Sequence, residues 1–181
     1  MPYLVSFSGL PGVGKTTIAR ALAREKQAVY IRVDSIETGI KESALRPASV
    51  EDAGYQAAFA VARDNLANGL NVVADTVNPV EISRQAWTEV ARVCNALLLD
   101  VEVVCSDPVE HRRRVESRVS DIEGLEQPTW QDVQDRHYEA WAKPRLVLDT
   151  ALLTTEECLS KIADAIGEQA YSRRSRRGSK P

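Results

Sequence analysis

The sequence GLPGVGKT, residues 9–16, matches the pattern G-x-x-x-x-G-K-[S/T] at every fixed position. A short apolar run, Tyr3 to Phe7, precedes it, and Ile18 and Leu22 follow it four residues apart, as on one face of a helix. The glycines allow a loop whose backbone N–H groups all point at one anion, beside the positive end of the next helix. The stretch therefore predicts a phosphate-binding loop rather than a glycine-rich turn with an exposed lysine.

Two side chains of this loop have the chemistry that a nucleoside triphosphate requires. Lys15 supplies a mobile positive charge for the β- and γ-phosphates, and Thr16 offers a hydroxyl group to Mg²⁺, which prefers oxygen ligands. ATP and Mg²⁺ are therefore the expected cofactors. The residues expected to bind the nucleotide are Gly9, Leu10, Pro11, Gly12, Val13, Gly14, Lys15, Thr16 and Thr17. Such a loop alone does not distinguish a kinase from a GTPase, a motor or a transporter ATPase.

Five short apolar runs are expected to be strands, and they alternate with stretches of helical periodicity. The strands are expected at residues 3–7, 28–31, 71–74, 97–105 and 146–148. This alternation predicts one α/β domain over residues 1–170, with a five-stranded parallel sheet and helices on both faces, and the phosphate-binding loop at 9–16 makes the expected fold that of a P-loop NTPase. A helical lid is expected at about residues 107–128, because a breaker-rich stretch at 120–128 follows a helix there.

Capping residues predict where several helices begin and end. Ser49 and Asp52 form a capping-box pattern, and Asn78 followed by Pro79 predicts the start of the next helix. Gly167 is expected to end the last helix. The helix after Pro79 is expected to turn these side chains inward: Ile82, Ala86, Val90 and Val93.

Acidic residues that follow the strands are candidate site residues, because parallel sheets bind ligands beyond the carboxyl ends of their strands. Asp34 follows the second strand, where a carboxylate can accept the proton of a hydroxyl that attacks the γ-phosphate; a helix cap is the alternative. Asp75 ends the third strand, where an acid can hold Mg²⁺ through water; a turn-forming aspartate is the alternative. Thr16 and Asp75 are thus the expected metal residues.

Four arginines crowd the helix before the breaker-rich stretch: Arg112, Arg113, Arg114 and Arg118. Arg114 and Arg118 lie four residues apart and so share a helix face. Phosphoryl transfer spreads negative charge over three oxygens, which an arginine stabilises, so one of the four is expected in the site. The alternative is a solvated helix face on which the arginines pair with Glu110, Glu116 and Glu123.

Neither histidine is expected to take part in catalysis. His111 has charged neighbours, which favour a surface position, whereas His137 shares a predicted helix face with Val133 and Trp141, which favours packing. The three cysteines are widely spaced and form no CxxC pair. This spacing excludes a zinc site and favours a reducing compartment.

Composition favours a single cytoplasmic domain. Hydrophobic residues make up 44% and charged residues 27% of the 181 residues, and no window approaches the roughly 18 apolar residues of a membrane span. Residues 171–181 are basic and have no apolar period, so we expect a disordered tail; an anion-contacting arm is the alternative. The rest of the chain is acidic and therefore a poor electrostatic host for long nucleic acid.

These motifs together resemble the small P-loop kinases that include phage polynucleotide kinase and chloramphenicol phosphotransferase. The likeness covers residues 3–167, and its marks are GLPGVGKTT at 9–17, VYIRVDSI at 29–36, VVADTVNP at 72–79 and the arginine pair at 114 and 118. The resemblance implies phosphate and Mg²⁺ contacts for Lys15 and Thr16 and a general base at Asp34. It also implies a lid arginine on the phosphates at Arg118 and an adenine contact for Arg114.

One position departs from the polynucleotide kinases. Where they carry an arginine that grips the 3′-phosphate, three residues after the base, this sequence has Glu37. A carboxylate would repel that phosphate, and Arg46 could replace the arginine only if the intervening segment folds back. The departure argues against a nucleic-acid end as acceptor.

The sequence therefore predicts an ATP- and Mg²⁺-dependent kinase that phosphorylates a hydroxyl group of a small molecule. Asp34 is expected to remove the proton, Lys15 and Arg118 to stabilise the transferring group, and residues 36–59 to form the acceptor pocket. Two alternatives stay open. One is a polynucleotide 5′-hydroxyl kinase that uses the basic tail as an arm, and the other is a nucleotide-binding switch without an acceptor.

Overall fold

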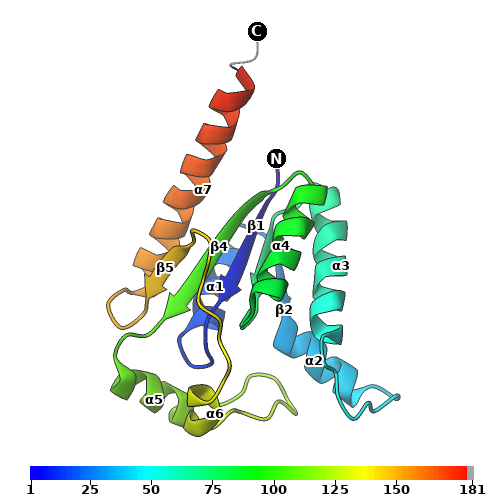
Figure 1. The fold of residues 1–181 in the computed structure, drawn as a ribbon, viewed down its shortest axis with the longest axis vertical. Helices are drawn as coiled ribbons and strands as arrows, with labels where there is room; N and C mark the ends of the chain where they lie inside the picture. The colour runs from blue at the N-terminus through cyan, green and yellow to red at the C-terminus, as the bar shows by residue number, and fades with distance from the viewer. Residues whose placement is uncertain (179–181) are drawn as a thin grey trace.

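The structure, a computed structural model, describes residues 1–178 and has a sheet of five parallel strands at its centre (Figure 1). The strands are β1 (Tyr3–Ser8), β2 (Val29–Arg32), β3 (Val72–Asp75), β4 (Leu97–Val104) and β5 (Leu146–Asp149). They lie in the order β2-β3-β1-β4-β5, and every neighbouring pair is parallel. The predicted five-stranded parallel sheet is confirmed, because each apolar run became a strand.

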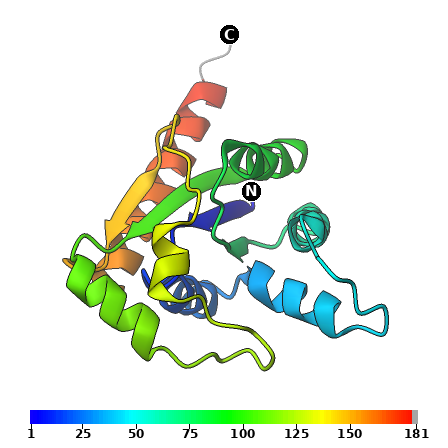
Figure 2. The ribbon, with the colours of Figure 1, turned by 60° about the horizontal axis from the view of Figure 1, so that its bottom comes forward.

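Helices cover both faces of this sheet (Figure 2). Within residues 1–178 they are α1 (Lys15–Glu25), α2 (Val33–Glu42), α3 (Ala53–Ala67), α4 (Glu81–Val93), α5 (Pro108–Ser117), α6 (Trp130–Gln134) and α7 (Thr155–Gly178). Leu4 and Val5 of β1 show the two-sided burial: Val5 packs under α1 and α7, and Leu4 packs under α3 and α4. None of these helices is both long enough and apolar enough to cross a membrane.

The strand order fixes where a ligand can bind. β1 lies between β3 and β4, so the chain crosses from one side of β1 to the other after β3. The carboxyl end of β1 is therefore the switch point at which parallel sheets bind ligands, and the phosphate-binding loop (residues 9–14) begins there. Asp75 is paired in register with Phe7 of β1 and with Arg32 of β2, which brings the ends of three strands to one place.

α7 is longer than the sequence predicted. Gly167 does not end the helix, and the chain stays helical to Gly178, so the expected disordered tail is wrong for residues 171–178. Residues 179–181 lie outside the described residues. A glycine inside a helix costs only about 1 kcal/mol, which neighbouring turns outweigh. Arg173 also tethers this end of the helix, because its guanidinium donates a hydrogen bond to the carbonyl oxygen of Ala96 at 3.1 Å.

α4 begins at Glu81 and not at Pro79, because Asn78 has another role. Asn78 has a left-handed backbone (φ 51°), and its buried side-chain amide donates hydrogen bonds to two serine hydroxyls of β1 at 3.3 and 3.4 Å. The side chain thus braces β1 and does not cap a helix. The expected inward face is also wrong at Ile82 and Val93, which are 77% and 52% exposed.

Two other local predictions are wrong. Ser49 and Asp52 do not form a capping box: the Ser49 hydroxyl accepts the N–H group two residues later, and α3 begins after Asp52 without a side-chain cap. The helix expected to reach Trp141 ends at Gln134. The chain beyond it is held by the buried Arg84 guanidinium, which donates hydrogen bonds to backbone carbonyls there and so competes with helix formation.

Candidate active site

The phosphate-binding loop is built on glycines with left-handed backbones. Gly9, Gly12 and Gly14 have φ angles of 134°, 84° and 95°, which residues with a Cβ atom rarely adopt. A Cβ atom on Gly12 would lie 2.4 Å from Cγ2 of Val115, so the loop also packs directly against α5. The loop leads into the first turn of α1, whose N–H groups have no partner within the helix and form an anion-binding terminus.

Lys15, the first residue of α1, is only 8% exposed. Its ammonium group donates a hydrogen bond to the carbonyl oxygen of Leu10 at 2.8 Å. Burial lowers the pKa of Lys15 to about 8, although the carboxylates of Asp75 and Asp34 favour its charged form. A lysine with so little solvation is stabilised by an anion placed beside it, and a phosphate on the loop would be such an anion.

His111 is buried against the loop, so the predicted surface position is wrong. It is 7% exposed, and its Nε2 donates a hydrogen bond to the carbonyl oxygen of Pro11 at 2.8 Å. The ring packs edge-on against Trp130, with 5.1 Å between ring centroids. His137, which was expected to pack, is exposed instead. On α5, His111 faces inward while the two arginines after it face solvent. The charge of its sequence neighbours therefore does not indicate whether His111 itself is exposed.

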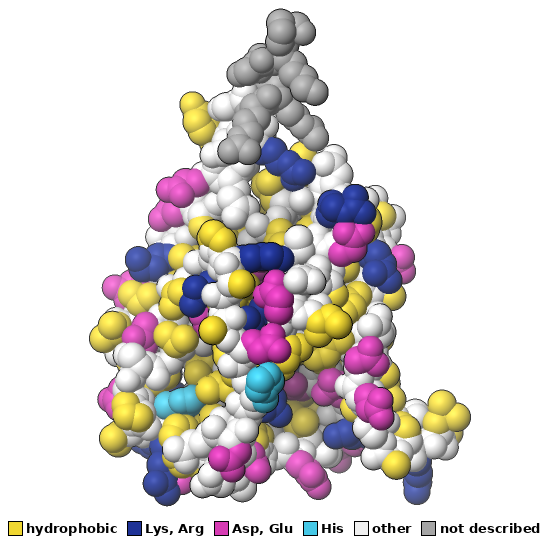
Figure 3. All heavy atoms as spheres, in the orientation of Figure 1, with side chains coloured by type: hydrophobic (Ala, Val, Ile, Leu, Met, Phe, Trp, Pro, Cys, Tyr) yellow, Lys and Arg dark blue, Asp and Glu magenta, His cyan; other side chains and the backbone are white. Residues whose placement is uncertain are grey.

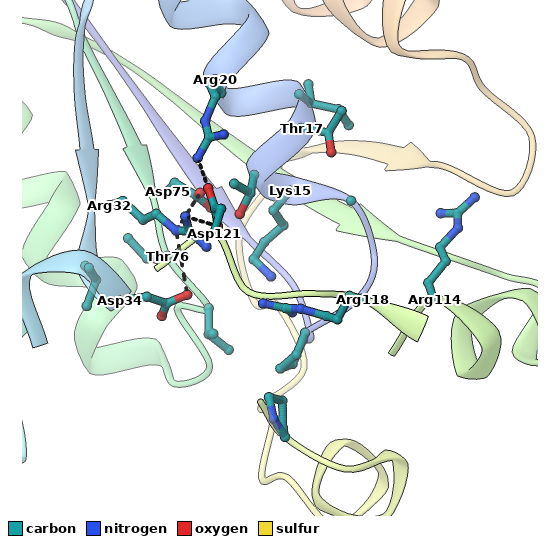
Figure 4. A pocket seen from close by; sticks show the side chains of 18 of the residues that line it. Lys15, Thr17, Arg20, Arg32, Asp34, Asp75, Thr76, Arg114, Arg118 and Asp121 are labelled. Atoms are coloured by element: carbon teal, nitrogen blue, oxygen red, sulfur yellow. Dashed lines mark hydrogen bonds and ion pairs between the residues drawn. The ribbon is translucent and has the colours of Figure 1, made fainter. Parts of the chain in front are cut away.

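Thr150, directly after β5, joins three parts of the site. Its hydroxyl donates to the carbonyl oxygen of Val13 in the loop at 2.8 Å and accepts a hydrogen bond from Nη1 of Arg114 at 2.7 Å. Arg114 also donates to the Glu110 carboxylate at 2.7 Å. In Figure 4, Arg114 lies well apart from Lys15. Arg114 is therefore on the β5 side of the loop, where it is already paired.

A buried arginine that the sequence reasoning missed lies between the two candidate acids. Arg32 ends β2, and its Nε is 3.9 Å from Oδ2 of Asp34 and 3.9 Å from Oδ2 of Asp75. The Tyr30 hydroxyl donates to Asp75 at 2.7 Å, and burial raises the pKa of that hydroxyl. Asp34 lies in the first turn of α2 and makes no cap bond, so the helix-cap alternative is wrong. The only sequence signal for Arg32 is its place at a strand end.

The lid segment (residues 118–128) reaches this cluster through Asp121. Its carboxylate accepts a hydrogen bond from Nη1 of Arg32 at 2.8 Å and pairs with Arg20 of α1 (Figure 4). Hydrogen bonds from Arg20 and Arg32 hold the pKa of Asp121 far below its usual range. No local pattern predicts these pairs, because Asp121 lies far from both arginines in the sequence.

Arg118 is the first residue after α5, and its side chain extends beside Lys15 in Figure 4. It is half-buried, and burial lowers the pKa of its guanidinium while the carboxylates of Asp34 and Asp121 oppose that effect. The expected lid at about 107–128 is helical only in α5, because the lid segment is irregular. The alternative of a solvated helix face holds for part of α5, because Glu110 and Glu116 form ion pairs with arginines of that helix.

These side chains line one cleft of about 1440 Å³. On its α2–α3 side the lining includes Glu37, Lys41 and Tyr55, whereas Phe59 is 5% exposed and belongs to the core. Glu37 lies over Gly54, where a Cβ atom would be 2.3 Å from the Glu37 Cγ. Burial and the nearby Asp34 carboxylate raise the pKa of Glu37.

The residues of the cleft fit a nucleotide with Mg²⁺. Within residues 1–178 no group of three or more His, Cys, Asp or Glu side chains could hold a metal ion. Mg²⁺ is bound by one or two protein oxygens together with water and substrate phosphates, so it needs no such group. Thr16 and Asp75 both line the cleft beside Lys15, where they could supply those oxygens.

Comparison with protein-family models identifies the family. The AAA_33 model, described as an AAA domain, matches residues 4–140, which include the phosphate-binding loop, both acids and the lid segment. This chain belongs to the AAA_33 family. AAA_33 is a family of P-loop kinases, so the resemblance to small P-loop kinases is confirmed.

Two curated kinases are similar to this AAA_33 protein. The adenylyl-sulfate kinase of Bacillus pumilus is 26% identical over 172 residues, which cover 92% of this chain and 86% of the relative. The "Probable bifunctional SAT/APS kinase 2" of Sorangium cellulosum is 25% identical over 184 residues, which cover 93% of this chain and 29% of the relative. The AAA_33 protein thus spans most of the first relative and less than a third of the second.

Two solved structures have the same fold. Kti12 of Chaetomium thermophilum, in complex with ADP-AlF3, is 26% identical with a TM-score of 0.66, over 90% of this chain and 98% of Kti12. The APS kinase CysC of Mycobacterium tuberculosis, in complex with AMPPNP and APS, has a TM-score of 0.65 over 92% of this chain and 98% of CysC. It is 17% identical, so this second likeness concerns the fold alone.

Proposed function

We propose that this AAA_33 protein is a kinase that uses ATP and Mg²⁺ to phosphorylate a hydroxyl group of a small molecule. The observation that carries the proposal is that Lys15, Asp34 and Arg118 line one cleft at the switch point of the sheet. The kinase family and neighbours solved with AMPPNP and with ADP-AlF3 support a nucleotide at this cleft. Its volume of about 1440 Å³ exceeds that of an ordinary single-ligand pocket.

Asp34 is the proposed general base. Its carboxylate accepts the proton of the acceptor hydroxyl while the hydroxyl oxygen forms a bond to the γ-phosphorus, and the bond from that phosphorus to the bridging oxygen of ADP breaks. Mg²⁺, bound by Thr16 and through water by Asp75, would neutralise charge on the phosphates. Lys15 and Arg118 balance the negative charge that spreads over the transferring group.

The two sides of the cleft suit the two substrates. Beyond the phosphate-binding loop, Arg114 and Thr150 border the side on which we propose that the adenine binds. Asp34, Glu37 and Tyr55 border the opposite side, which we assign to the acceptor. The phosphates lie between the two sides, next to Lys15, so the acceptor hydroxyl approaches the γ-phosphate from the Asp34 side.

A small acceptor is favoured over a polynucleotide end. Glu37 lines the acceptor side, where Lys41 and Arg136 offset part of its charge, and Arg46, the candidate replacement for the missing arginine, is exposed and does not line the cleft. The C-terminal end of α7 lies at the opposite end of the molecule from α5, α6 and the phosphate-binding loop, which contribute residues to the cleft (Figure 1). In Figure 3, acidic and basic side chains alternate over the visible face without a continuous basic patch that could track a phosphate backbone.

Transfer of label from γ-³²P-ATP tests the proposal. The protein is incubated with Mg²⁺ and a small-molecule filtrate of a bacterial extract, with a 5′-hydroxyl oligonucleotide, or with water alone. We expect labelled phosphate esters from the filtrate and none from the oligonucleotide. Label on the oligonucleotide would support the polynucleotide kinase instead, and release of inorganic phosphate only, in all three samples, would support the nucleotide switch.

Asp34→Asn tests the general base with almost no change in shape. We expect it to reduce transfer by about 10²-fold or more while MgATP binding is retained, because the amide cannot accept the proton. Asp64→Asn on the exposed face of α3 is the matched control, since Asp64 does not line the cleft. Normal transfer by Asp34→Asn would exclude Asp34 as the base.

A further inference from the structure

The lid segment has no fully buried apolar side chain to hold it in place. No residue from 118 to 128 is buried, and Val119 is 91% exposed. Ile122 and Leu125 are half-buried, and a Cβ atom on Gly124 would lie 2.2 Å from Oε1 of Glu42 in α2. Packing therefore contributes to the position of the lid segment, but less than it does for the helices that cover the sheet. Besides its junction with α5, the lid segment makes its charged contacts through Asp121, which pairs with Arg20 and Arg32.

The two arginines contribute unequally to this contact. Arg20 is 39% exposed, and an exposed ion pair is weak because water and salt screen it. Arg32 is 5% exposed, and within residues 1–178 its guanidinium makes its one hydrogen bond to Asp121. If the lid segment opened, Arg32 would lose that hydrogen bond and keep only its longer contacts to Asp34 and Asp75 at 3.9 Å, which is unfavourable. The Arg32–Asp121 pair therefore favours the closed position.

The same pair bears on three groups of the proposed reaction. Only two residues separate Arg118 from Asp121, so anchoring Asp121 keeps Arg118 within about 10 Å of the cluster, next to Lys15 (Figure 4). Arg32 already lies 3.9 Å from both Asp34 and Asp75. Without Asp121, these two acids would be the remaining ion-pair partners of Arg32 among the described residues.

We infer that Asp121 is a positioning residue that closes the lid segment by pairing with Arg32 and Arg20, and so holds Arg118 over the phosphate-binding loop. The inference rests on the proposed phosphoryl transfer and adds to it the residue that keeps the lid arginine in place. Asp121 itself touches no reacting atom in this scheme. It acts through Arg118.

Proteolysis of the nucleotide-free protein tests the closure directly. Thermolysin cleaves before large apolar residues, which the lid segment offers, and cleavage in this regime reports the population of the open form. We expect Asp121→Asn to raise the rate of cleavage within residues 118–128 about tenfold, and Asp121→Glu to restore part of the protection. Glu123→Gln is the control, because Glu123 is exposed in the same segment and does not line the cleft. An unchanged rate in Asp121→Asn would overturn the closure.

Binding of ADP with aluminium fluoride and Mg²⁺, compared with ADP alone, tests the link to Arg118. We expect Asp121→Asn and Arg118→Gln each to weaken the aluminium fluoride complex about tenfold and ADP alone little, because only that complex mimics the transferring group. The double variant should lose no more than either single variant. Losses that multiply would show that Asp121 does not act through Arg118. If the unmodified protein binds neither ligand, the proposed function fails, while the proteolysis result still stands.

Discussion

The Nε2 atom of His111 lies 2.8 Å from the carbonyl oxygen of Pro11, so helix α5 is bonded directly to the phosphate-binding loop. Both residues are buried, and the histidine ring also packs against Trp130 at the start of α6. A buried carbonyl that loses its donor costs free energy, so this bond restricts the shape of the loop. The His111 side chain thereby couples α5 and the loop, in addition to the packing of Gly12 against Val115.

His111→Phe keeps a ring against Trp130 but removes the donor to Pro11. We expect MgATP affinity, measured by calorimetry, to fall about tenfold, because an unpaired buried carbonyl costs roughly 1–3 kcal/mol and lets the loop change shape. His111→Gln should restore part of the affinity through its amide N–H. His137→Phe is the matched control, since that side chain is 77% exposed. Equal affinities for His111→Phe and the unmodified protein would contradict a role in shaping the loop.

The lowered pKa of Lys15 leads us to expect that the protein takes up a proton when it binds a nucleotide. Its pKa is lowered to about 8, chiefly by burial, and phosphate beside it favours the charged form. Above pH 8 the free protein therefore carries a largely neutral Lys15 that must gain a proton, so MgATP affinity should fall as the pH rises through 8. Titrations at pH 8.5 in two buffers of different ionisation enthalpy measure this uptake. Identical heats in both buffers would mean that no proton is taken up.

The buried Asp100, which lies outside the candidate active site, should make the folding stability of the protein depend on pH. Burial raises its pKa from 3.8 to about 6, and its Oδ1 is buried without a hydrogen-bond partner among residues 1–178. Because the folded-state pKa is the higher one, the stabilising contribution is complete below about pH 4 and is lost as the pH rises through 6. Asp100→Asn should therefore match the unmodified protein at pH 4 and exceed its unfolding free energy by at most about 3 kcal/mol at pH 8.

Urea denaturation at both pH values measures the effect of Asp100→Asn. Other groups titrate in the same range, so the informative quantity is the difference between the variant and the unmodified protein at each pH. Asp64→Asn, on the exposed face of α3, should show the same small difference at pH 4 and pH 8. A difference for Asp100→Asn that does not grow with pH would show that burial does not raise this pKa.

The sheet and the backbone of the site could be predicted because they follow from local patterns. Apolar runs of strand length gave all five strands, and the rule that ligands bind beyond strand ends pointed to Lys15, Asp34 and Asp75. These three residues do line one cleft. Each was found from its position relative to a strand or a loop, without knowledge of any distant contact.

The rest of the site depends on contacts between residues far apart in the chain. Arg32 is hydrogen-bonded to Asp121, and His111 to Pro11, across about ninety to one hundred residues of sequence. Neither hydrophobic periodicity nor a capping pattern predicts such pairs. The burial of single side chains likewise depends on distant contacts that the local sequence does not show. The charged neighbours of His111 face solvent while the histidine itself packs against the loop, and Asn78 braces β1 where its type suggested a helix cap.

Substitution of Gly167 tests whether α7 continues beyond this residue, where the sequence predicted that the helix ends. Gly167 lies inside the helix, and beyond the helix's own backbone no atom of the described residues lies within 4 Å of where its Cβ atom would be. Gly167→Ala should therefore raise the unfolding free energy by about 0.5–1 kcal/mol, because alanine restricts the unfolded chain and suits a helix interior. Gly69→Ala is the matched control: it also has open space, but its φ of 84° is left-handed, so the same change should destabilise by about 1–2 kcal/mol. Urea denaturation measures both changes. A loss of stability in Gly167→Ala similar to that expected for Gly69→Ala would mean that Gly167 has a left-handed backbone. The helix would then end at Gly167, as helices with a C-terminal glycine commonly do.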